Sequence, residues 1–491
     1  MFLRELLRCA GYALPAKMAD VEIKGISSDS RTVQPGELFV AINGLRYDAS
    51  RFVGEAFQKG AVFAVCERFV EGAVLVVENA REALARLYDA WYCHPAEGMT
   101  LIGVTGTNGK TSTATMLCAI LEHAGHRCGL IGTVECRLGE QRLIAPNRDR
   151  LANMTTPDPA QLYQLLAQLR DGGAEYVVME VTSHALAFSK TAPLCFERAI
   201  FTNLTPDHLD LHKDMESYYL EKRKLFDQTR GAVISCLSPY GKRLADELDL
   251  PLWRLDAETV KNIEKKQDAG VEFDLCLSPQ APFHMKIPVP GDFSVENGAL
   301  AAITAVSLGV DACQAQRALL RFPGVRGRME RVGENPFGFS VFLDYAHTAD
   351  ALEKLLRAVR GFCGAGQRVT VLFGCGGDRD PSKRKEMGRV ASRLADFVIL
   401  TSDNCRSERQ EDILRDILKG IDKEKSHKVI PDRQEAIRYA VRTARAGDVI
   451  LLAGKGHETY EIRGRERLYF SEKEIVEEAI AQRIRGEEDA D

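Results

Sequence analysis

Residues 101–113, LIGVTGTNGKTST, constrain the fold of this chain more than any other segment. A short apolar run, residues 101–104, ends in a turn that contains two glycines, and residues 114–121 have the pattern of a helix. Glycines let the backbone approach phosphate groups closely, and the amides at the start of a helix point at negative charge. The order of strand, turn and helix therefore predicts a phosphate-binding loop, and the alternative is an ordinary turn with an exposed lysine.

The loop offers specific contacts to a nucleotide. Lys110 is placed to reach the outer phosphates, and the hydroxyl of Thr111 is placed to ligate Mg²⁺. The spacing is shorter than the usual Walker consensus, because two residues separate the glycines that precede the lysine. The residues predicted to bind the nucleotide here are Gly106, Thr107, Asn108, Gly109, Lys110, Thr111 and Ser112.

The 491 residues are enough for about three domains of ordinary size. Residues 93–98 (CHPAEG) and 322–328 (FPGVRGR) have the composition of linkers. We therefore expect domains over residues 1–97, 98–325 and 326–491. Because strands alternate with helices in the second and third of these, the fold class is α/β with largely parallel sheets.

Several classes of protein are disfavoured by composition. The net charge of −5 gives no indication of nucleic-acid binding, and no window approaches the roughly 18 apolar residues of a membrane span. The first ten residues carry Arg4, Glu5 and Arg8, unlike a signal peptide. The 13 cysteines are odd in number and never form a C-x-x-C pair. We expect reduced, mostly buried thiols and a cytoplasmic location.

Two polar residues follow strands of the predicted second domain. Glu180 ends the apolar run 176–180, and His208 follows the run 198–203. Taken singly, Glu180 is also explained as a surface carboxylate and His208 as a helix-capping residue. Ligands of parallel sheets gather at the carboxyl ends of the strands, where the phosphate loop also lies. This shared edge favours a role in binding metal or substrate.

The third domain carries mixed charges after three of its predicted strands. Acidic side chains suit an ammonium group and arginines suit a carboxylate, so these loops predict a zwitterionic small-molecule ligand. The residues concerned are Arg379, Asp403, Arg406, Lys455, His457 and Glu458.

Two other polar segments have ordinary interpretations. Residues 27–31 (SSDSR) could form a polar pocket, but a hydrogen-bonded turn is favoured. The helix predicted over residues 217–228 contains several lysines, Lys222 among them, that would ordinarily form a solvated face.

Taken together, the motifs resemble those of the Mur ligase family over essentially the whole chain. They are VTGTNGKTST, MEVTSHAL, TNLTPDHLDLH, KRKLF, LDYAHTADAL, GCGGDRD, SDNCRSE and LLAGKGHETY. The resemblance implies an N-terminal domain for the UDP end of the substrate, a central ATPase domain and a Rossmann-like C-terminal domain. It also implies an enzyme of peptidoglycan precursor synthesis that uses ATP and Mg²⁺ and adds the third amino acid to UDP-N-acetylmuramoyl-L-alanyl-D-glutamate.

The resemblance assigns roles to residues that match the family motifs. For the UDP-muramoyl-dipeptide they are Ser28, Ser30, Leu45, Arg46, Tyr47, Thr155, Thr156, Thr182 and Lys190. Near ATP they are Asn297, Arg328, Asp344 and His347, with the phosphate loop. For the incoming amino acid they are Arg379, Asp403, Asn404, Cys405, Arg406, Gly454 and Glu458. Thr111, Glu180 and His208 match residues associated with magnesium, and Lys222 matches a lysine carbamylated by CO₂. Lys110, Lys222 and His208 are the implied catalytic residues.

The sequence departs from the family at three of these positions. Cys405 replaces the usual proline of the DNPR loop and leaves its backbone freer, Thr182 replaces a common serine, and Lys190 replaces a common arginine. In the family, an arginine at the end of this loop goes with meso-diaminopimelate, which differs from lysine by a second carboxylate. Arg406 therefore predicts meso-diaminopimelate as the acceptor.

Other functions remain as alternatives. The same ligase could add L-lysine, or the chain could be another Mur ligase or a folylpolyglutamate synthase. A phosphate-loop kinase or regulatory NTPase would need no amino acid. A non-catalytic nucleotide-binding module is disfavoured because Lys110 and Glu180 are both present. We expect a monomer that binds only small molecules.

Overall fold

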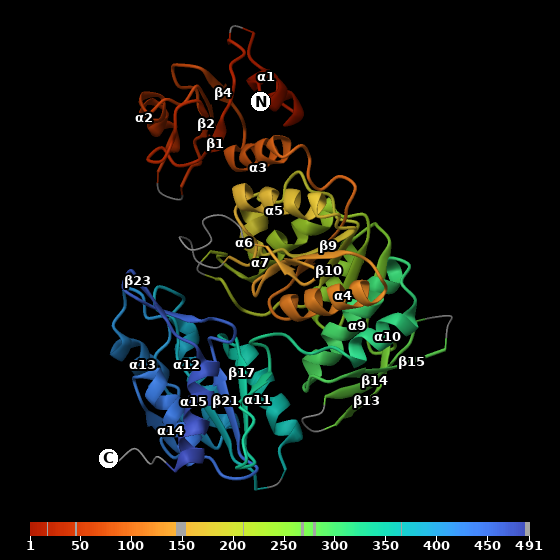
Figure 1. The fold of residues 1–491 in the computed structure, drawn as a ribbon, viewed down its shortest axis with the longest axis vertical. Coiled ribbons are helices and arrows are strands. Elements are labelled where there is room, and N and C mark those ends of the chain that lie inside the picture. Colours follow the sequence, from red (N-terminus) through yellow and green to blue (C-terminus); the bar gives the residue numbers. More distant parts are fainter. Residues whose placement is uncertain are drawn as a thin grey trace.

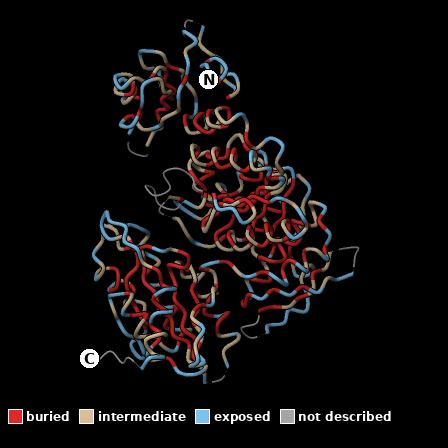
Figure 2. The backbone as a smooth tube through the Cα atoms, in the orientation of Figure 1, coloured by how far each residue is buried: buried red, intermediate tan, exposed pale blue. Residues whose placement is uncertain are grey.

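The computed structural model describes the chain except for residues 17, 45–46, 144–153, 210, 267–269, 278–280, 365 and 487–491. Three sheet-containing bodies follow one another along the molecule, from the N-terminal part through the centre to the C-terminal part (Figure 1). In each body the buried residues follow the strands and the inner faces of the helices (Figure 2). The α/β fold class with mostly parallel sheets is confirmed.

The N-terminal sheet has four parallel strands in the order β1-β2-β3-β4. They are β1 (Gly25–Ser27), β2 (Glu37–Val40), β3 (Phe63–Cys66) and β4 (Val74–Val76). The helices around it are α1 (Leu3–Cys9), the 3₁₀ helix η1 (Ala49–Phe52), α2 (Val53–Gln58) and α3 (Ala80–Trp91). The Asn79 side chain caps α3 by accepting from the amides of Arg81 and Glu82. This fixes where the last helix before the central body begins.

The central sheet has eight strands in the order β12-β11-β10-β5-β9-β6-β7-β8, and only β7 and β8 run antiparallel to their neighbours. The strands are β5 (Thr100–Thr105), β6 (Cys128–Ile131), β7 (Cys136–Leu138), β8 (Gln141–Arg142), β9 (Tyr176–Glu180), β10 (Arg198–Phe201), β11 (Ala232–Ser235) and β12 (Leu252–Leu255). Strands β5, β9 and β10, whose ends carry the predicted site, lie side by side.

Helices cover both faces of this sheet (Figure 1). They are α4 (Lys110–His123), α5 (Pro159–Asp171), α6 (Ser183–Ala187), α7 (Met215–Arg223), the 3₁₀ helix η2 (Lys224–Gln228), α8 (Pro239–Glu247), α9 (Asp292–Ser307) and α10 (Ala312–Leu320). The apolar helix α9 packs against α4, and both contribute to one large core. The helix that follows the phosphate loop is therefore held in place by its packing against α9.

A separate antiparallel sheet was not predicted. It consists of β13 (Val260–Lys265), β14 (Val271–Leu275) and β15 (Phe283–Ile287). In β14, Val271, Phe273 and Leu275 are buried, while the two acidic residues between them are partly exposed. This alternation of apolar and acidic residues is the sequence signal of a half-buried strand.

The C-terminal sheet has six strands in the order β16-β17-β21-β18-β19-β20, with only β16 antiparallel. They are β16 (Glu330–Val332), β17 (Ser340–Asp344), β18 (Val369–Phe373), β19 (Phe397–Leu400), β20 (His427–Val429) and β21 (Val449–Ala453). The helices are α11 (Ala349–Phe362), α12 (Ser382–Leu394), α13 (Gln410–Leu418), α14 (Arg433–Thr443) and α15 (Glu472–Arg485). A hairpin of β22 (Tyr460–Arg463) and β23 (Glu466–Tyr469) follows the last sheet strand.

The cysteines differ in part from expectation. All 13 are free thiols, as predicted, but only six are buried and three are exposed. The expectation that most are buried is therefore wrong. Among the described residues, none of the helices has the length and apolarity needed to cross a membrane.

Candidate active site

Two glycines give the phosphate loop its shape. Gly106 and Gly109 have φ angles of 145° and 85°, a region that favours glycine. A Cβ on Gly106 would lie 1.9 Å from Thr202 Oγ1, and one on Gly109 would lie 2.4 Å from Asn297 Oδ1. The loop follows β5, and Gly109 begins α4. The predicted order of strand, glycine turn and helix is confirmed.

The loop backbone is tied to the end of the neighbouring strand β10. Thr202 Oγ1 donates to the carbonyl of Asn108 at 2.6 Å, and Asn203 Oδ1 accepts from the Asn108 amide at 3.0 Å. Sequence reasoning assigned no role to Thr202 or Asn203. The signal was present, because both follow a strand beside the phosphate loop.

Two lysine ammonium groups meet at one carbonyl oxygen of this loop. Lys110 Nζ and Lys222 Nζ each lie 2.9 Å from the oxygen of Gly106. Burial lowers the pKa of Lys110, and burial together with the charge of Lys110 lowers the pKa of Lys222 well below its ordinary value. Lys222 is 1% exposed, so the interpretation of its helix face as solvated is wrong at this position.

Glu180 is buried at the end of β9, which excludes the interpretation as a surface carboxylate. Its Oε2 accepts from Thr111 Oγ1 at 2.9 Å and from Thr133 Oγ1 at 3.0 Å, and its Oε1 accepts from the Thr133 amide at 2.7 Å. Thr133, which follows β6, was not predicted. The carboxylate is thus fixed beside the first turn of α4.

His208 lies in a group of rings and charges next to the loop. Its Nε2 is 3.4 Å from Asp207 Oδ2, and its ring is 4.9 Å from that of His184. Tyr218 approaches from α7, with Lys222 Nζ 4.7 Å from its ring centre and its hydroxyl 3.3 Å from Thr107 Oγ1. The structure therefore brings His208 and Lys222 to the same side of the phosphate loop.

The residues predicted to hold the muramoyl-dipeptide gather beyond Glu180. Thr156 Oγ1 donates to the carbonyl of Glu180 at 2.8 Å and accepts from the amide of Thr182 at 3.1 Å. Thr155 Oγ1 is 3.0 Å from Thr133 Oγ1. Lys190 is buried, and its Nζ lies 2.8 Å from Asp158 Oδ1. These side chains form one polar group connected to the phosphate loop through Glu180.

The predicted UDP-binding residues lie apart, in the N-terminal body. Residues 27–31 form the expected turn, in which the Arg31 side chain and amide both bond to Asp29. Ser30 Oγ donates to Glu55 at 3.2 Å, while Ser28 is exposed and Tyr47 is half exposed. Leu45 and Arg46 fall outside the described residues.

The linker to the C-terminal body returns to the phosphate loop. Arg328 Nη2 lies 3.3 Å from Thr111 Oγ1, and its guanidinium stacks 4.6 Å from the ring centre of Tyr345. Asp344 is held by the amides of Met329 and Ala346, both at 2.8 Å. His347 Nδ1 is 2.9 Å from the carbonyl of Tyr345, and burial lowers the pKa of His347 to about 4. The predicted ATP residues are thereby brought beside α4.

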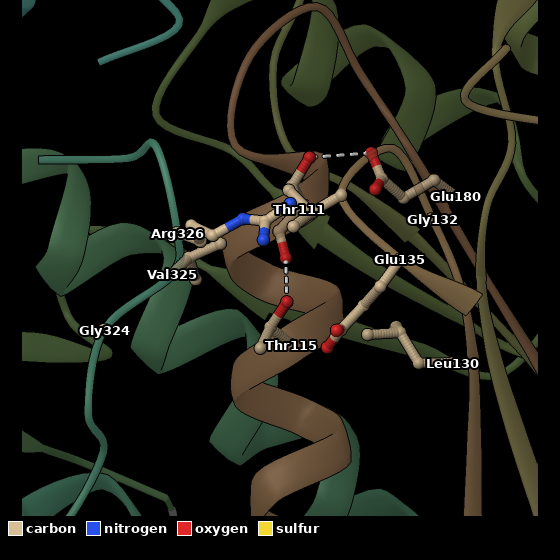
Figure 3. Close-up of a pocket in the computed structure, with 10 residues that line it drawn as sticks. Thr111, Thr115, Leu130, Gly132, Glu135, Glu180, Gly324, Val325 and Arg326 are labelled. Carbon is tan, nitrogen blue, oxygen red and sulfur yellow. Dashed lines mark hydrogen bonds between the residues drawn. The ribbon is translucent and has the colours of Figure 1, made fainter. Parts of the chain in front are cut away.

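A small cavity opens at the same place (Figure 3). Its volume is about 120 Å³, which is below the roughly 300 Å³ at which ligand pockets begin. Thr111 and Thr115 lie one helical turn apart on its wall, with Glu180 bonded to Thr111 (Figure 3). Arg326 from the linker also lines the cavity. The cavity thus lies between the first turns of α4 and the linker that precedes the C-terminal body.

The C-terminal sheet edge carries a buried cluster of charged side chains. Lys455 Nζ donates to Asn404 Oδ1 at 3.2 Å and lies 3.7 Å from both Asp403 and Glu458. Asn404 Nδ2 in turn donates to Glu458 Oε2 at 2.9 Å. Burial raises the pKa of Glu458, with help from the charge of Asp403. Burial opposes ionisation of Asp403 too, but Lys455 and Arg433 outweigh it and keep the pKa of Asp403 low.

Arg406 connects this cluster to the glycine-rich loop after β18. Its φ is 50°, and its Nη1 donates to the carbonyl of Gly377 at 2.7 Å. Its backbone pairs with β22, through Arg406 N to Ile462 O at 3.2 Å. Arg379 is exposed on the same loop as Gly377, and the Cys405 thiol lies 3.8 Å from the carbonyl of Ile462. The three predicted loops therefore converge, as the strand-end rule requires.

The two halves of the site touch through Asp350, at the start of α11. Its Oδ2 accepts from Asn108 Nδ2 at 2.9 Å and from Thr205 Oγ1 at 3.2 Å. The residue was not predicted, because nothing in the sequence pairs α11 with the phosphate loop. The contact places the phosphate loop and the cluster of charged side chains on opposite sides of one interface.

Comparison with family models covers most of the chain. The Mur ligase middle domain matches residues 104–306, and the Mur ligase glutamate ligase domain matches residues 327–456. The model described as the Mur ligase family catalytic domain matches residues 22–92.

Individual proteins agree with these matches. A UDP-N-acetylmuramoyl-L-alanyl-D-glutamate–2,6-diaminopimelate ligase of Chlorobaculum tepidum is 42% identical, over 94% of this chain and 93% of that relative. A relative of the same name from Gloeobacter violaceus is 41% identical, over 98% and 99%. A solved structure of an enzyme of that name is 30% identical, with a TM-score of 0.64 over 94% of this chain and 95% of its own. The folylpolyglutamate synthase of Mycobacterium tuberculosis shares the fold, at 18% identity and a TM-score of 0.63 over 83% and 96%. The chain belongs to the Mur ligase family.

Proposed function

We propose that this protein is an ATP-dependent ligase that joins meso-diaminopimelate to UDP-N-acetylmuramoyl-L-alanyl-D-glutamate during peptidoglycan precursor synthesis. The observation that carries the proposal is the pairing of a phosphate loop, across the Asp350 contact, with a separate cluster of buried charged side chains, which we take as the amino-acid pocket. A kinase needs only the first of these. Relatives named for this reaction, about 40% identical along nearly the whole chain, support it.

The chemistry begins with activation of a carboxyl group. Lys110 and the amides of the phosphate loop stabilise the γ-phosphate of ATP while the side-chain carboxylate of D-glutamate attacks the γ-phosphorus and displaces ADP. The acyl phosphate that forms then reacts with the amine of the incoming amino acid, and phosphate leaves. Thr156, Thr182 and Lys190 orient the dipeptide. Catalysis depends on positioning and charge, so no side chain acts as a covalent nucleophile.

The residues at the loop fit Mg²⁺, which prefers oxygen ligands and keeps several waters and phosphate oxygens. Thr111 and Glu180 provide two hard oxygens joined by a 2.9 Å hydrogen bond. Among the described residues no cluster of three or more carboxylate, histidine or cysteine side chains is built for a metal, which suits an ion shared with phosphates. With His208, these residues would hold an ion that neutralises phosphate charge.

Lys222 is the proposed site of carbamylation. Its lowered pKa leaves a neutral amine available to CO₂, and the resulting anion would lie beside the buried ammonium group of Lys110 and pair with its charge. Native mass spectrometry of the protein with and without bicarbonate tests this. A mass increase of one CO₂ that disappears in Lys222→Met supports it, and an active enzyme that never carries the adduct contradicts it.

We also propose the division of labour among three domains, with boundaries near residues 97 and 325. The sheets support it, since within the described part of the chain no sheet combines strands from both sides of either boundary. The N-terminal domain would bind the UDP end, and the C-terminal domain would bring the amino acid to the acyl phosphate by closing. We propose a monomer that works in the cytoplasm, where its substrates are made.

The decisive experiment measures ADP release with the UDP-dipeptide and a panel of amino acids. We expect release to require both substrates and kcat/KM for meso-diaminopimelate to exceed that for L-lysine by about 100-fold or more, because Arg406 pairs with the second carboxylate. Release that is independent of any amino acid contradicts the ligase, and equal use of lysine contradicts the acceptor.

A matched pair of variants tests the role of Arg406. Arg406→Ala should reduce kcat/KM for diaminopimelate and leave that for lysine nearly unchanged. Arg463→Ala is the control, because Arg463 lies opposite Arg406 in a β-bridge but its side chain pairs with Glu461. If both variants change the preference equally, Arg406 does not read the second carboxylate.

A further inference from the structure

One arginine that no motif singled out lies behind the proposed amino-acid pocket. Arg433, the first residue of α14, is fully buried. Its Nη1 donates to the carbonyl of Ser402 and its Nη2 to the carbonyl of Ala453, both at 2.9 Å. Ser402 immediately precedes Asp403, and Ala453 immediately precedes Gly454. A single guanidinium therefore holds the start of both loops that form the pocket.

The sheet does not join the starts of these two loops directly. Strand β18 lies between β19 and β21, so the strands that lead into the two loops share no backbone hydrogen bonds. The relative position of Asp403 and Glu458 therefore depends in part on contacts beyond the strand ends, where Lys455 and the Asn404–Glu458 hydrogen bond also join the two loops. We propose that Arg433 is a positioning residue that sets the spacing between the two loops and thereby the shape of the amino-acid pocket.

A second buried charge fixes the guanidinium. Glu472, at the start of α15, accepts from Arg433 Nε at 2.8 Å, and its Oε1 also lies 2.8 Å from Nη2. Its other oxygen has no hydrogen-bond partner among the described residues. The planar fork of arginine thus reaches three acceptors in fixed directions, which a lysine cannot do. Glu472 thus orients the guanidinium group of Arg433, and the guanidinium group orients the two loops.

This inference rests on the proposed function, because the pocket is taken to bind the incoming amino acid. Removing Arg433 alone would leave Glu472 buried and unpaired and could prevent folding. The test therefore uses Arg433→Met with Glu472→Met, which removes both charges and retains apolar volume. Glu472→Gln is the conservative variant, because it keeps an acceptor for Arg433 and leaves both loop contacts possible.

The expected result is a selective change in amino-acid binding. In the double variant KM for the amino acid should rise about tenfold or more, while KM for ATP and for the UDP-dipeptide stays within about twofold. Glu472→Gln should show a smaller rise. Arg368→Met with Asp448→Asn is the matched control, because it removes both charges of the Arg368–Asp448 pair at the opposite ends of β18 and β21.

Hydrogen exchange of backbone amides tests the role of Arg433 independently of the reaction that the enzyme performs. In the double variant, backbone amides of residues 403–406 and 454–458 should exchange faster than in the wild type. Exchange at the phosphate loop should not change. Both expectations hold whichever reaction the enzyme performs. Unchanged exchange in these loops, or an equal rise of all three KM values, overturns the positioning role. If ADP release by the wild-type protein needs no amino acid, the proposed function is wrong. Hydrogen exchange alone then tests whether Arg433 positions the two loops.

Discussion

At the scale of single residues, the site depends on charges that burial makes unusual. Lys110 and Lys222 share one carbonyl oxygen, and Lys455 lies between two carboxylates on the other sheet. A charge removed from water is stable only when its partners are fixed. Each of these lysines is therefore tied to backbone oxygens as well.

Glu458 provides a prediction of pH dependence. Its pKa in the folded protein is raised, mainly by burial, so the folded state holds this proton more tightly than the unfolded chain does. This stabilisation is present at pH values below the unfolded pKa and is lost as the pH rises through the folded pKa. Glu458→Gln does not titrate there. We expect the variant to gain stability relative to the wild type as the pH rises through this range.

Urea unfolding at a series of pH values measures this difference. Asp412→Asn on the exposed side of α13 is the control, since Asp412 pairs only with the exposed Arg415. A stability difference between wild type and Glu458→Gln that does not change with pH contradicts the prediction. The variant should also bind the amino acid less well, because a carboxylate whose ionisation lowers stability can still be needed for binding.

At the scale of elements, the phosphate loop has its shape because β5, β10 and α9 surround it. Thr202 at the end of β10 and Asn297 on α9 leave no room for a side chain at either glycine. The phosphate loop itself is therefore tightly packed, as is the helix that follows it.

Gly106→Ala tests this packing. The new Cβ would lie 1.9 Å from Thr202 Oγ1 at a φ of 145°, so we expect a loss of about 3 kcal/mol or more and weaker ATP binding. Gly125→Ala is the control, because Gly125 also has a positive φ but meets nothing within 4 Å. It should cost about 1 kcal/mol and leave ATP binding unchanged. Thermal unfolding and nucleotide titration measure both, and equal losses in the two variants would disprove the crowding.

At the scale of the whole molecule, the proposed function requires the C-terminal body to approach the central one. The described contacts between the phosphate loop and α11 meet at Asp350, which also pairs with Lys354 on its own helix. The interface also includes apolar packing, because residues of α9 and α11 belong to one buried cluster and Ala358 lies close to Gly291. Interfaces between domains of one chain commonly permit relative motion.

Asp350→Ala should therefore favour an open arrangement. Two hydrogen bonds worth about 1 kcal/mol each are lost, so the open population should rise by about 30-fold, increasing the radius of gyration before substrates are added. Small-angle X-ray scattering measures this change. Glu353→Ala is the control on the same helix, because Glu353 pairs with Arg357 and Arg393 inside the C-terminal body. An identical scattering profile for both variants contradicts the prediction.

The sequence by itself determined the phosphate loop, the alternation of strands and helices, and the strand-end positions of Glu180, Asp403 and Glu458. These follow from local patterns, because residues after parallel strands must lie at one sheet edge. Only the tertiary structure decided that Lys222 is buried against Gly106 and that Arg433 joins two loops across a strand. It alone paired Asp350 with the phosphate loop. Such contacts connect residues far apart in the chain, and no local periodicity records which distant group a side chain will meet.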